Sequence, residues 1–148
     1  MERLGDHQQV CILRSANVHG HGRCIRFDAV INRFVFQAHF QGRITVRGSG
    51  EQRRPFIHVD AVVSTLAALL GPNELTGTYD LVEQDHSVVE LVEALRGVHP
   101  ETELLFVDQH LDLLSMEVKR DERLLGIQPM RHRTLEQAVQ ELSARLAW

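Results

Sequence analysis

Residues 44–62 read ITVRGSGEQRRPFIHVDAV, and the interpretation of the chain starts from this stretch. Apolar and polar residues alternate over 44–47, which is typical of a half-buried strand. The run Gly48-Ser49-Gly50 predicts a turn, because glycine tolerates positive φ angles. A second alternation over 56–59 predicts another short strand. Asp60 is then expected to cap an apolar helix that ends at a Gly-Pro pair.

Two adjacent arginines, Arg53 and Arg54, precede the second of these strands. A guanidinium at a strand edge beside a glycine turn suits an anionic ligand such as a phosphate, because it presents several donors in one plane. The alternative is a turn arginine that only water contacts. The residue types and their spacing leave both interpretations open.

The same stretch resembles a segment in the C-terminal half of the extended short-chain dehydrogenases/reductases, the NAD-dependent nucleotide-sugar epimerases and dehydratases. The matching positions are Val46, Gly48, Gly50, Gln52, Arg54, Phe56, Ile57, Val59 and Asp60. Ala61 departs from the pattern, since the family often has a second aspartate there. The resemblance implies that Arg54 binds the diphosphate of a nucleotide sugar, with Gln52 and Val46 in the same substrate-binding segment.

An apolar run and a glycine-rich loop lie upstream. The run Val10–Leu13 predicts a strand that is buried on both faces, and the loop follows over residues 14–22. The loop resembles the family's LRxxNVYGPG, with His19 and His21 in place of tyrosine and proline. The resemblance implies that Asn17 also contacts the diphosphate, a role that suits a side-chain amide donor. The alternative is an asparagine that only shapes the turn.

Periodicity and capping signals predict the other elements. A helix is expected over residues 27–40, capped by Asp28 and ended by Gly42, and the resemblance places it near the substrate site. The remaining expected elements are a strand at 76–82, a helix at 88–95 opened by a Ser87/Glu90 capping box and stopped by Gly97, a short strand at 103–107, a helical turn within 119–126, and a helix at 135–146 opened by a Thr134/Gln137 capping box. Together they predict an α/β fold in a single domain over residues 1–148, with a small sheet of about four or five strands and flanking helices.

Composition excludes several classes of function. The net charge is −4, so no basic field would attract nucleic acid. The longest nearly apolar run, residues 61–70, is too short for a membrane span. Two cysteines, Cys11 and Cys24, do not make a disulfide framework, which favours a reduced, cytoplasmic setting.

Two features of working family members are missing from these 148 residues. None of the ten glycines gives the GxxGxxG spacing of a dinucleotide site. The Tyr-x-x-x-Lys catalytic pair is also absent, because the sole tyrosine is Tyr79 and the sole lysine is Lys119. The resemblance thus implies the substrate-binding half of the fold without its N-terminal Rossmann half. We expect no catalytic residues here and no cofactor bound by this chain alone, with NAD(P) only where a partner supplies that half.

Three functional interpretations follow. The favoured one is a nucleotide-sugar binding domain of a truncated or split epimerase/dehydratase-like protein that is not catalytically competent alone. The alternative is a non-catalytic interaction or regulatory domain with a relic ligand site. The third is a different enzyme, for which His58 and Asp60 could form an acid/base pair, and His19, His21 and Cys24 could bind a metal. Packing, helix capping and chance pairing explain these residues better, so no metal site is predicted.

Association with a partner is also expected. Without the other half of the fold, apolar surface would be exposed on Val10–Leu13 and on part of the 27–40 helix. Large exposed apolar patches usually find a partner. The sequence therefore predicts a homodimer or higher oligomer, or a complex with a chain that carries the Rossmann half, in addition to a nucleotide sugar.

Overall fold

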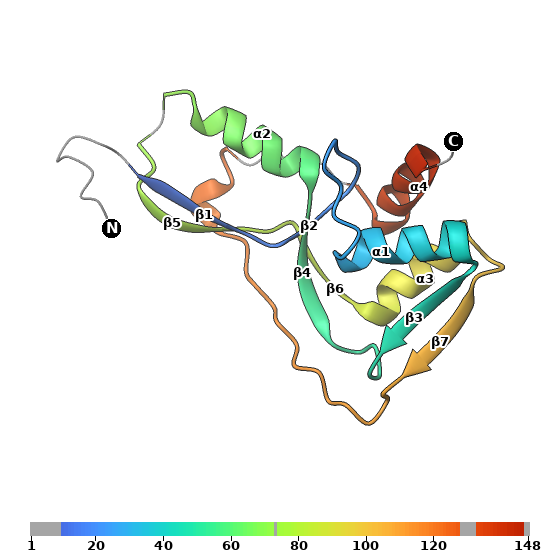
Figure 1. Cartoon of the computed structure of the whole chain (residues 1–148). Helices are drawn as coiled ribbons and strands as arrows, with labels where there is room; N and C mark the ends of the chain where they lie inside the picture. Colours follow the sequence, from blue (N-terminus) through green and yellow to red (C-terminus); the bar gives the residue numbers. More distant parts are fainter. Residues whose placement is uncertain (1–9, 73, 128–132, 147–148) are drawn as a thin grey trace.

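The computed structural model describes residues 10–72, 74–127 and 133–146 (Figure 1). The elements in chain order are β1 (Cys11–Ser15), β2 (Asn17–His19), α1 (Val30–Phe36), a π-helical segment (Gln37–Gln41), β3 (Arg43–Arg47), β4 (Arg53–His58), α2 (Val59–Leu69), β5 (Gly77–Leu81), β6 (Gln84–Ser87), α3 (Val88–Val98), β7 (Glu103–Val107), a 3₁₀ turn (Glu122–Leu124) and α4 (Leu135–Leu146). No helix in the described residues is long and apolar enough to cross a membrane.

The α/β class is confirmed, but the strands form three small sheets where the sequence predicted one. β1 pairs in parallel with β5, and β3 pairs in parallel with β7. β4 lies between β2, which is parallel to it, and β6, which is antiparallel. β3 and β4 are adjacent in sequence and belong to different sheets, because the intervening loop leads the chain away from β3.

Two glycines shape that loop. Gly48 has a φ of 72° and Gly50 a φ of 83°, which are left-handed conformations that favour glycine. A Cβ at Gly50 would lie 3.1 Å from Cγ2 of Val89, and the Gly50 carbonyl accepts a hydrogen bond from the Val89 backbone N–H at 3.0 Å. The predicted turn is therefore confirmed, and it docks on the first turn of α3.

The caps of two helices differ from prediction. The N-cap of α2 is His58, whose Nδ1 accepts a hydrogen bond from the backbone N–H of Asp60 at 3.1 Å. Asp60 therefore lies in the first turn of α2, where a carboxylate is favourable beside the helix dipole. Asp28 does not cap α1 either, because it pairs with Arg26 and leaves Ala29 at the N-cap without a side-chain bond.

Of the other predicted starts and ends of helices, three are confirmed and one is wrong. Both capping boxes are present, with reciprocal bonds between Ser87 and Glu90 and between Thr134 and Gln137. Gly42 ends the helical segment with a φ of 62°, as expected. Gly97 does not stop α3, which continues to Val98.

The core has two parts. One lies among α1, α3, α4, β3 and β4; its largest fully buried side chains include those of Ile31, Phe34, Ile44, Leu91, Leu95 and Leu142. The other lies among β1, β4, β5 and α2, and its members are Ile57, Ala61, Tyr79, Leu81 and Leu124. β4 contributes to both, with Phe56 in the first and Ile57 in the second. An extended segment, residues 108–121, returns from β7 past the start of β4 to the 3₁₀ turn; we call it the strap.

β1 is not buried on both faces, contrary to prediction. Ile12 is 52% exposed and Val10 is 41% exposed. In the part of the chain that the structure describes, β1 pairs with β5 alone. The exposed apolar surface expected on this segment is therefore present, and so is exposed apolar surface at Phe27 and Phe40 on either side of α1.

Candidate functional site

A groove of about 760 Å³ brings together three of the four predicted binding residues. Asn17, Gln52 and Arg54 all line it, although 35 or more positions separate the first from the other two. The groove lies between β2, the start of β4, the N-terminal part of α1 and the strap. It has the mixed polar and apolar walls that ligand grooves usually have.

The position of Asn17 in the groove lining is fixed by its contacts with β4. β2 pairs in parallel with β4, which sets Asn17 opposite Phe56. Its Nδ2 donates a hydrogen bond to the carbonyl of Pro55 at 3.0 Å. A side-chain amide nitrogen carries two hydrogens, so Asn17 can bond the backbone with one and a ligand oxygen with the other.

The two adjacent arginines have different surroundings. Arg53 donates to the Glu90 carboxylate at 2.9 Å and to the Asp85 carbonyl at 2.6 Å, and Glu117 lies 3.4 Å away. Arg54 donates to backbone carbonyls, those of Arg53 at 2.8 Å and of Leu114. Successive side chains of a strand point to opposite faces, which explains the difference. The charge of Arg53 is thus neutralised inside the protein, whereas the charge of Arg54 faces the groove.

Gln52 and Val46 have contrasting environments. Gln52 Nε2 donates to the Arg47 carbonyl at 3.3 Å, and its Oε1 is buried without a hydrogen-bond partner among the described residues. A buried acceptor of this kind is costly unless something donates to it. Val46 is buried in the core at 1% exposure and does not line the groove, so this placement gives its predicted ligand contact no support.

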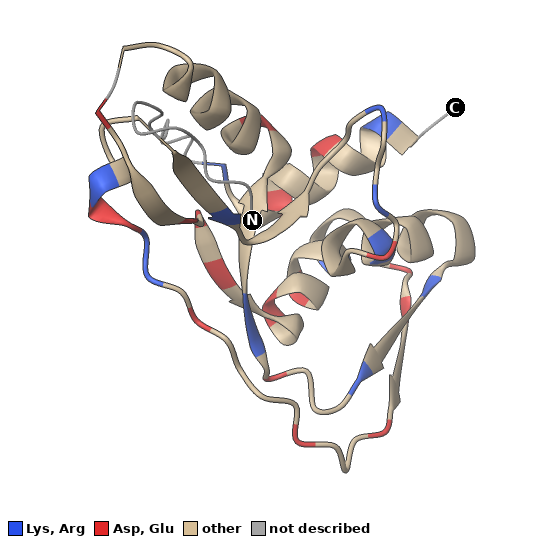
Figure 2. Ribbon diagram, turned by 60° about the vertical axis from the view of Figure 1, so that its left-hand side comes forward, with Lys and Arg blue, Asp and Glu red and all other residues tan. Residues whose placement is uncertain are grey.

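Three further arginines line the groove, and the sequence analysis missed them. Arg26 and Arg33 come from the loop before α1 and from α1 itself, and Arg47 comes from the end of β3. Figure 2 shows basic segments on β3 and on the start of β4, near the loop that joins them. The alternation of apolar and polar residues along β3 could have identified Arg47 as a lining residue. Val46 points into the core, so the side chain of the next residue must point away from it.

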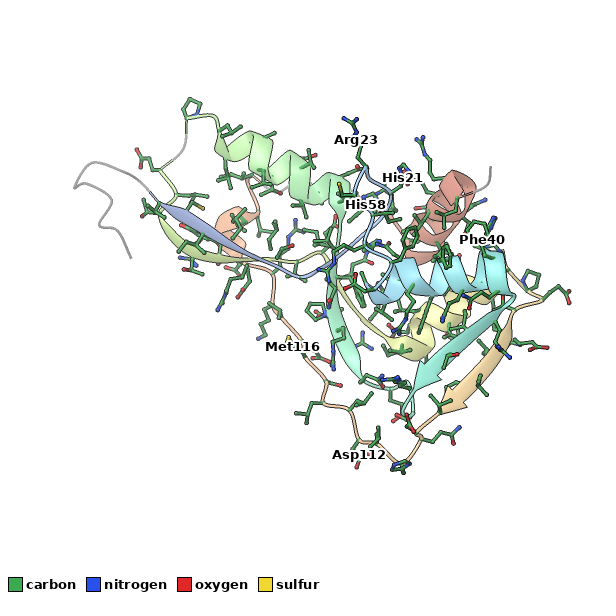
Figure 3. The ribbon with its side chains drawn as sticks, in the orientation of Figure 1. His21, Arg23, Phe40, His58, Asp112 and Met116 are labelled. Atoms are coloured by element: carbon green, nitrogen blue, oxygen red, sulfur yellow. The ribbon has the colours of Figure 1, made fainter. Side chains whose placement is uncertain are left out.

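The strap covers one side of the groove. Its Ser115 Oγ accepts a hydrogen bond from the Arg53 backbone N–H at 3.0 Å, and the Met116 N–H donates to the Arg53 carbonyl at 2.9 Å. Figure 3 shows Met116 beside β4 and Asp112 lower in the view, in the part of the strap nearer to β7. Leu113 and Met116 line the groove itself. The strap therefore adds apolar surface to one wall of the groove.

A second, nearly enclosed pocket lies on the other side of β4 and contains three histidines. His19 packs edge-on to His58 with ring centroids 5.2 Å apart, and His86 and Arg133 also line the pocket. Burial, together with the nearby charges of His58, Arg133 and His86, lowers the pKa of His19 to about 3. Nδ1 of His19 has no hydrogen-bond partner among the described residues. His19 is therefore a neutral core residue.

The pKa of His19 predicts a dependence of stability on pH. In the unfolded chain this histidine takes up a proton near pH 6.5, whereas in the folded chain it stays neutral down to about pH 3. Acid therefore favours the unfolded state throughout this window, and the free energy of unfolding should fall by about 2 kcal/mol between pH 7 and pH 5 from His19 alone. Urea unfolding at both pH values measures this change. A His19→Gln variant should lose that part of the dependence, and an unchanged slope would show that His19 is not the cause.

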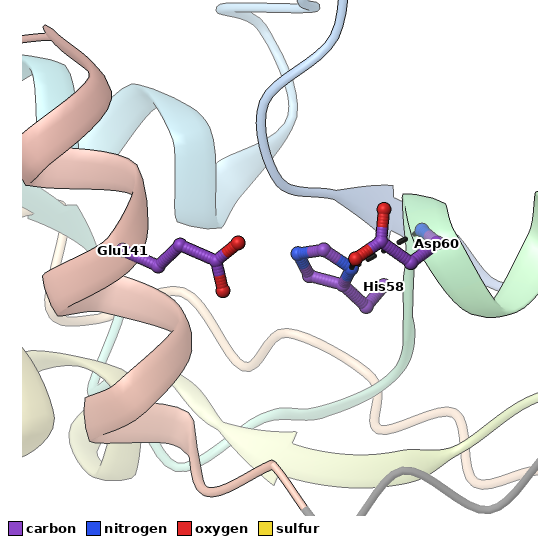
Figure 4. Close-up of side chains that lie close together, drawn as sticks. All are labelled: His58, Asp60 and Glu141. Carbon is purple, nitrogen blue, oxygen red and sulfur yellow. Dashed lines mark hydrogen bonds and ion pairs between the residues drawn. The ribbon is translucent and has the colours of Figure 1, made fainter.

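One cluster has the composition of a metal site. His58, Asp60 and Glu141 bring ligand atoms within 4.8 Å of one another (Figure 4). Arg133, however, lies 3.3 Å from the Asp60 carboxylate and 3.1 Å from that of Glu141. A guanidinium already supplies the positive charge, so the cluster is better described as an ion-pair link between α4 and α2. His21 and Cys24 are not in this group, and His19 is not either.

His58 and Asp60 do not form a catalytic pair that faces a substrate. Their side chains are 3.5 Å apart, but Nδ1 of His58 is engaged as the α2 cap, and the ring is buried. A general base must reach the proton that it removes. The packing role considered for His58 fits this geometry, whereas the capping role expected of Asp60 is taken by His58.

Tyr79 is enclosed in the core and does not line the groove. Tyr79, the sole tyrosine, is 3% exposed, and its hydroxyl donates to the Thr76 carbonyl at 2.7 Å. The guanidinium of Arg123 covers its ring, 4.3 Å from the centroid. This tyrosine is a core residue, and it cannot serve as the acid/base of a hydride transfer.

Comparisons with known proteins identify the family of this chain. A family model described as "NAD dependent epimerase/dehydratase family" matches residues 3–81. UDP-glucuronic acid decarboxylase 1 of Xenopus tropicalis is 28% identical over 126 residues, which are 82% of this chain and 30% of that protein. The Arabidopsis thaliana protein of the same name is 32% identical over 91 residues, 61% of this chain and 21% of that protein.

Solved structures give the same fold. The NAD dependent NDP-hexosamine 5,6-dehydratase TunA superposes with a TM-score of 0.78 at 25% identity, over 92% of this chain and 45% of TunA. UDP-glucuronic acid 4-epimerase from Bacillus cereus, in complex with UDP-glucuronic acid and NAD, gives 0.75 at 19% identity, over 93% of this chain and 45% of the epimerase. The chain therefore spans less than half the length of each of these relatives.

Proposed function

Because the chain belongs to the NAD dependent epimerase/dehydratase family, we propose that it is a nucleotide-sugar binding domain whose arginine-lined groove receives the diphosphate. The observation that carries this proposal is the meeting of Asn17, Gln52 and Arg54 in one groove. Arg54 supplies a planar fork of donors that matches phosphate oxygens. Asn17 supplies a neutral amide donor beside it.

The other groove walls suit the remaining parts of such a ligand. Leu113 and Met116 of the strap offer apolar surface to a base or a sugar face. Gln52 also lines the groove, and a side-chain amide can donate to or accept from a sugar or ribose hydroxyl. The curated relatives carry UDP-glucuronic acid in their names, which makes uridine nucleotides the first ligands to test.

The proposal assigns no catalytic role to the residues of this chain. The proposed domain binds a nucleotide sugar and does not transform it alone, since its sole tyrosine is buried and hydrogen-bonded to the backbone. A nicotinamide cofactor and a Tyr/Lys pair would have to come from a Rossmann half outside these 148 residues. Supporting this division, the chain covers 45% of the TunA dehydratase.

Calorimetric titration tests the proposal. The purified chain should bind UDP-glucose or UDP-glucuronic acid and give no heat with NAD under the same conditions. If neither UDP-sugar gave a heat of binding, the proposed binding function would be contradicted. It would favour the second candidate, an interaction domain with a relic ligand site, which the exposed apolar surface of β1 supports.

We also propose that copies of this chain associate with one another through the free edge of β1. Val10 and Ile12 are exposed beside a strand that pairs on one side only in the described residues. Open strand edges with apolar side chains pair readily with another chain. Analytical ultracentrifugation should show a dimer or larger species that an Ile12→Lys substitution disrupts. A monomeric parent chain would refute pairing between copies through this edge.

A further inference from the structure

The strap runs along one side of the groove without the support of a helix or strand of its own (Figure 1). Two of its hydrogen bonds are made with the backbone at the start of β4. Ser115 Oγ accepts from the Arg53 N–H at 3.0 Å, and the Met116 N–H donates to the Arg53 carbonyl at 2.9 Å. Further along, the Val118 N–H donates to the Asp85 carboxylate at 3.4 Å. The strap is therefore attached by individual hydrogen bonds and not as a strand of a sheet.

The apolar side chains of the strap add little to this attachment. Four large apolar side chains of the strap are 40–85% exposed, those of Leu111, Leu113, Leu114 and Met116. No strap residue belongs to either part of the core. Segments that bury little apolar surface open at a low cost in free energy. The strap can therefore leave the groove and return to it without disturbing the core.

Part of this exposed apolar surface faces the groove. A Cβ added at Gly48 would lie 3.2 Å from Cδ1 of Leu113, so this side chain is seated against the glycine turn. Leu113 also lines the groove, and so does Met116. Covering exposed apolar surface is favourable. A ligand that fills the groove would therefore favour a position of the strap in which these two side chains lie against it.

The Arg54 side chain joins the strap to the proposed diphosphate site. Its Nη1 donates to the carbonyls of Leu114 and Arg53, whereas its Nε and Nη2 donate to no described residue. Nε and Nη2 form one edge of the planar guanidinium, and their two parallel N–H groups match a pair of phosphate oxygens. Arg54 can therefore hold the strap through one nitrogen and a phosphate through the other two at the same time.

We propose that the strap is a clamp that closes on a bound nucleotide sugar and is coupled to the diphosphate through Arg54. This proposal rests on the nucleotide-sugar function above and adds a conformational step at the same groove. A phosphate that fixes the guanidinium also fixes the donor to the Leu114 carbonyl, while Leu113 and Met116 pack on the ligand. Coupling between two events is reciprocal, so a change that loosens the strap must also weaken ligand binding.

Hydrogen exchange measured by mass spectrometry tests the closure of the clamp. With UDP-glucose at saturation, the strap amides, including those of Met116 and Val118, should exchange at least about tenfold more slowly than in the free chain. The reason is that the ligand raises the free energy needed to open the strap. α2 is the internal reference, because it does not line the groove and its exchange should stay unchanged.

A Ser115→Ala variant tests the reciprocal effect. Ser115 does not line the groove, so its hydroxyl acts on a ligand only through the strap. The variant should bind UDP-glucose about two- to tenfold more weakly in titration calorimetry, the range that one lost hydrogen bond gives. Ser64→Ala is the matched control, since Ser64 lies on α2 outside both the groove and the strap, and it should bind like the parent.

The outcomes separate the clamp from the binding function. Unchanged or faster exchange of the strap in the saturated complex would overturn the clamp and leave the nucleotide-sugar function standing. Parental affinity in the Ser115→Ala variant would likewise overturn the coupling between strap and ligand. If neither UDP-glucose nor UDP-glucuronic acid bound to the parent chain, the nucleotide-sugar function would fall, and the clamp with it.

Discussion

Replacing Arg54 by alanine should lower the affinity for UDP-sugars by about 30- to 150-fold, because a phosphate loses a charge-assisted guanidinium pair worth roughly 2–3 kcal/mol. The effect should exceed that of any other single groove substitution, since Arg54 is the residue assigned to the diphosphate and the Arg53 and Leu114 carbonyls hold its guanidinium in place. Titration calorimetry with UDP-glucose measures it.

Two further variants test whether the loss of affinity is specific to the guanidinium of Arg54. Arg54→Lys keeps the charge and loses the planar fork, so its affinity should fall between those of the parent and the alanine variant. Arg43→Ala removes an exposed arginine outside the groove and should change the affinity little. Parent-like binding by Arg54→Ala would show that the diphosphate lies elsewhere.

The Gly20→Ala substitution should be the most damaging conservative change to stability, by about 2–4 kcal/mol from positive-φ strain and overpacking together. Gly20 has a φ of 104°, and an added Cβ would lie 2.5 Å from Nε2 of His58. His58 cannot easily yield, because its other ring nitrogen caps α2. Gly20 also donates its backbone N–H to Oδ1 of Asn32 at 3.1 Å, which ties the loop to α1.

Urea unfolding of Gly20→Ala and Gly22→Ala side by side checks this prediction. An added Cβ at Gly22 meets nothing within 4 Å, and its φ is not in the left-handed range. The Gly22 variant should therefore keep the parental stability. Similar losses in both variants would mean that glycine flexibility, and not contact with His58, governs the loop.

Local signals in the sequence were good guides where the physics is local. The capping boxes at Ser87 and Thr134 need only residues three apart, and both are formed. The Gly48–Gly50 turn needs only backbone freedom, and it is present. The prediction that Asn17 and Arg54 serve one site came from the family resemblance, and the structure places both on one groove.

Signals that depend on distant residues were less informative. β3 pairs with β7, which follows it by more than fifty residues, so the division into three sheets could not be read from either strand. A continuous apolar run is buried on both faces only if other elements pack against both faces of the strand, and the 52% exposure of Ile12 shows that one face of β1 is uncovered. His58 is not among the residue types that usually cap helices, so Asp60 was the natural, and wrong, choice.

The most direct test of the account is a crystal structure of the chain with UDP-glucuronic acid. We predict that the diphosphate lies within hydrogen-bonding distance of Arg54 and Asn17, with the strap residues Leu113 and Met116 against the ligand. A ligand bound instead in the histidine pocket of His19, His58 and His86, or on the exposed edge of β1, would contradict the assignment of the groove as the nucleotide-sugar site.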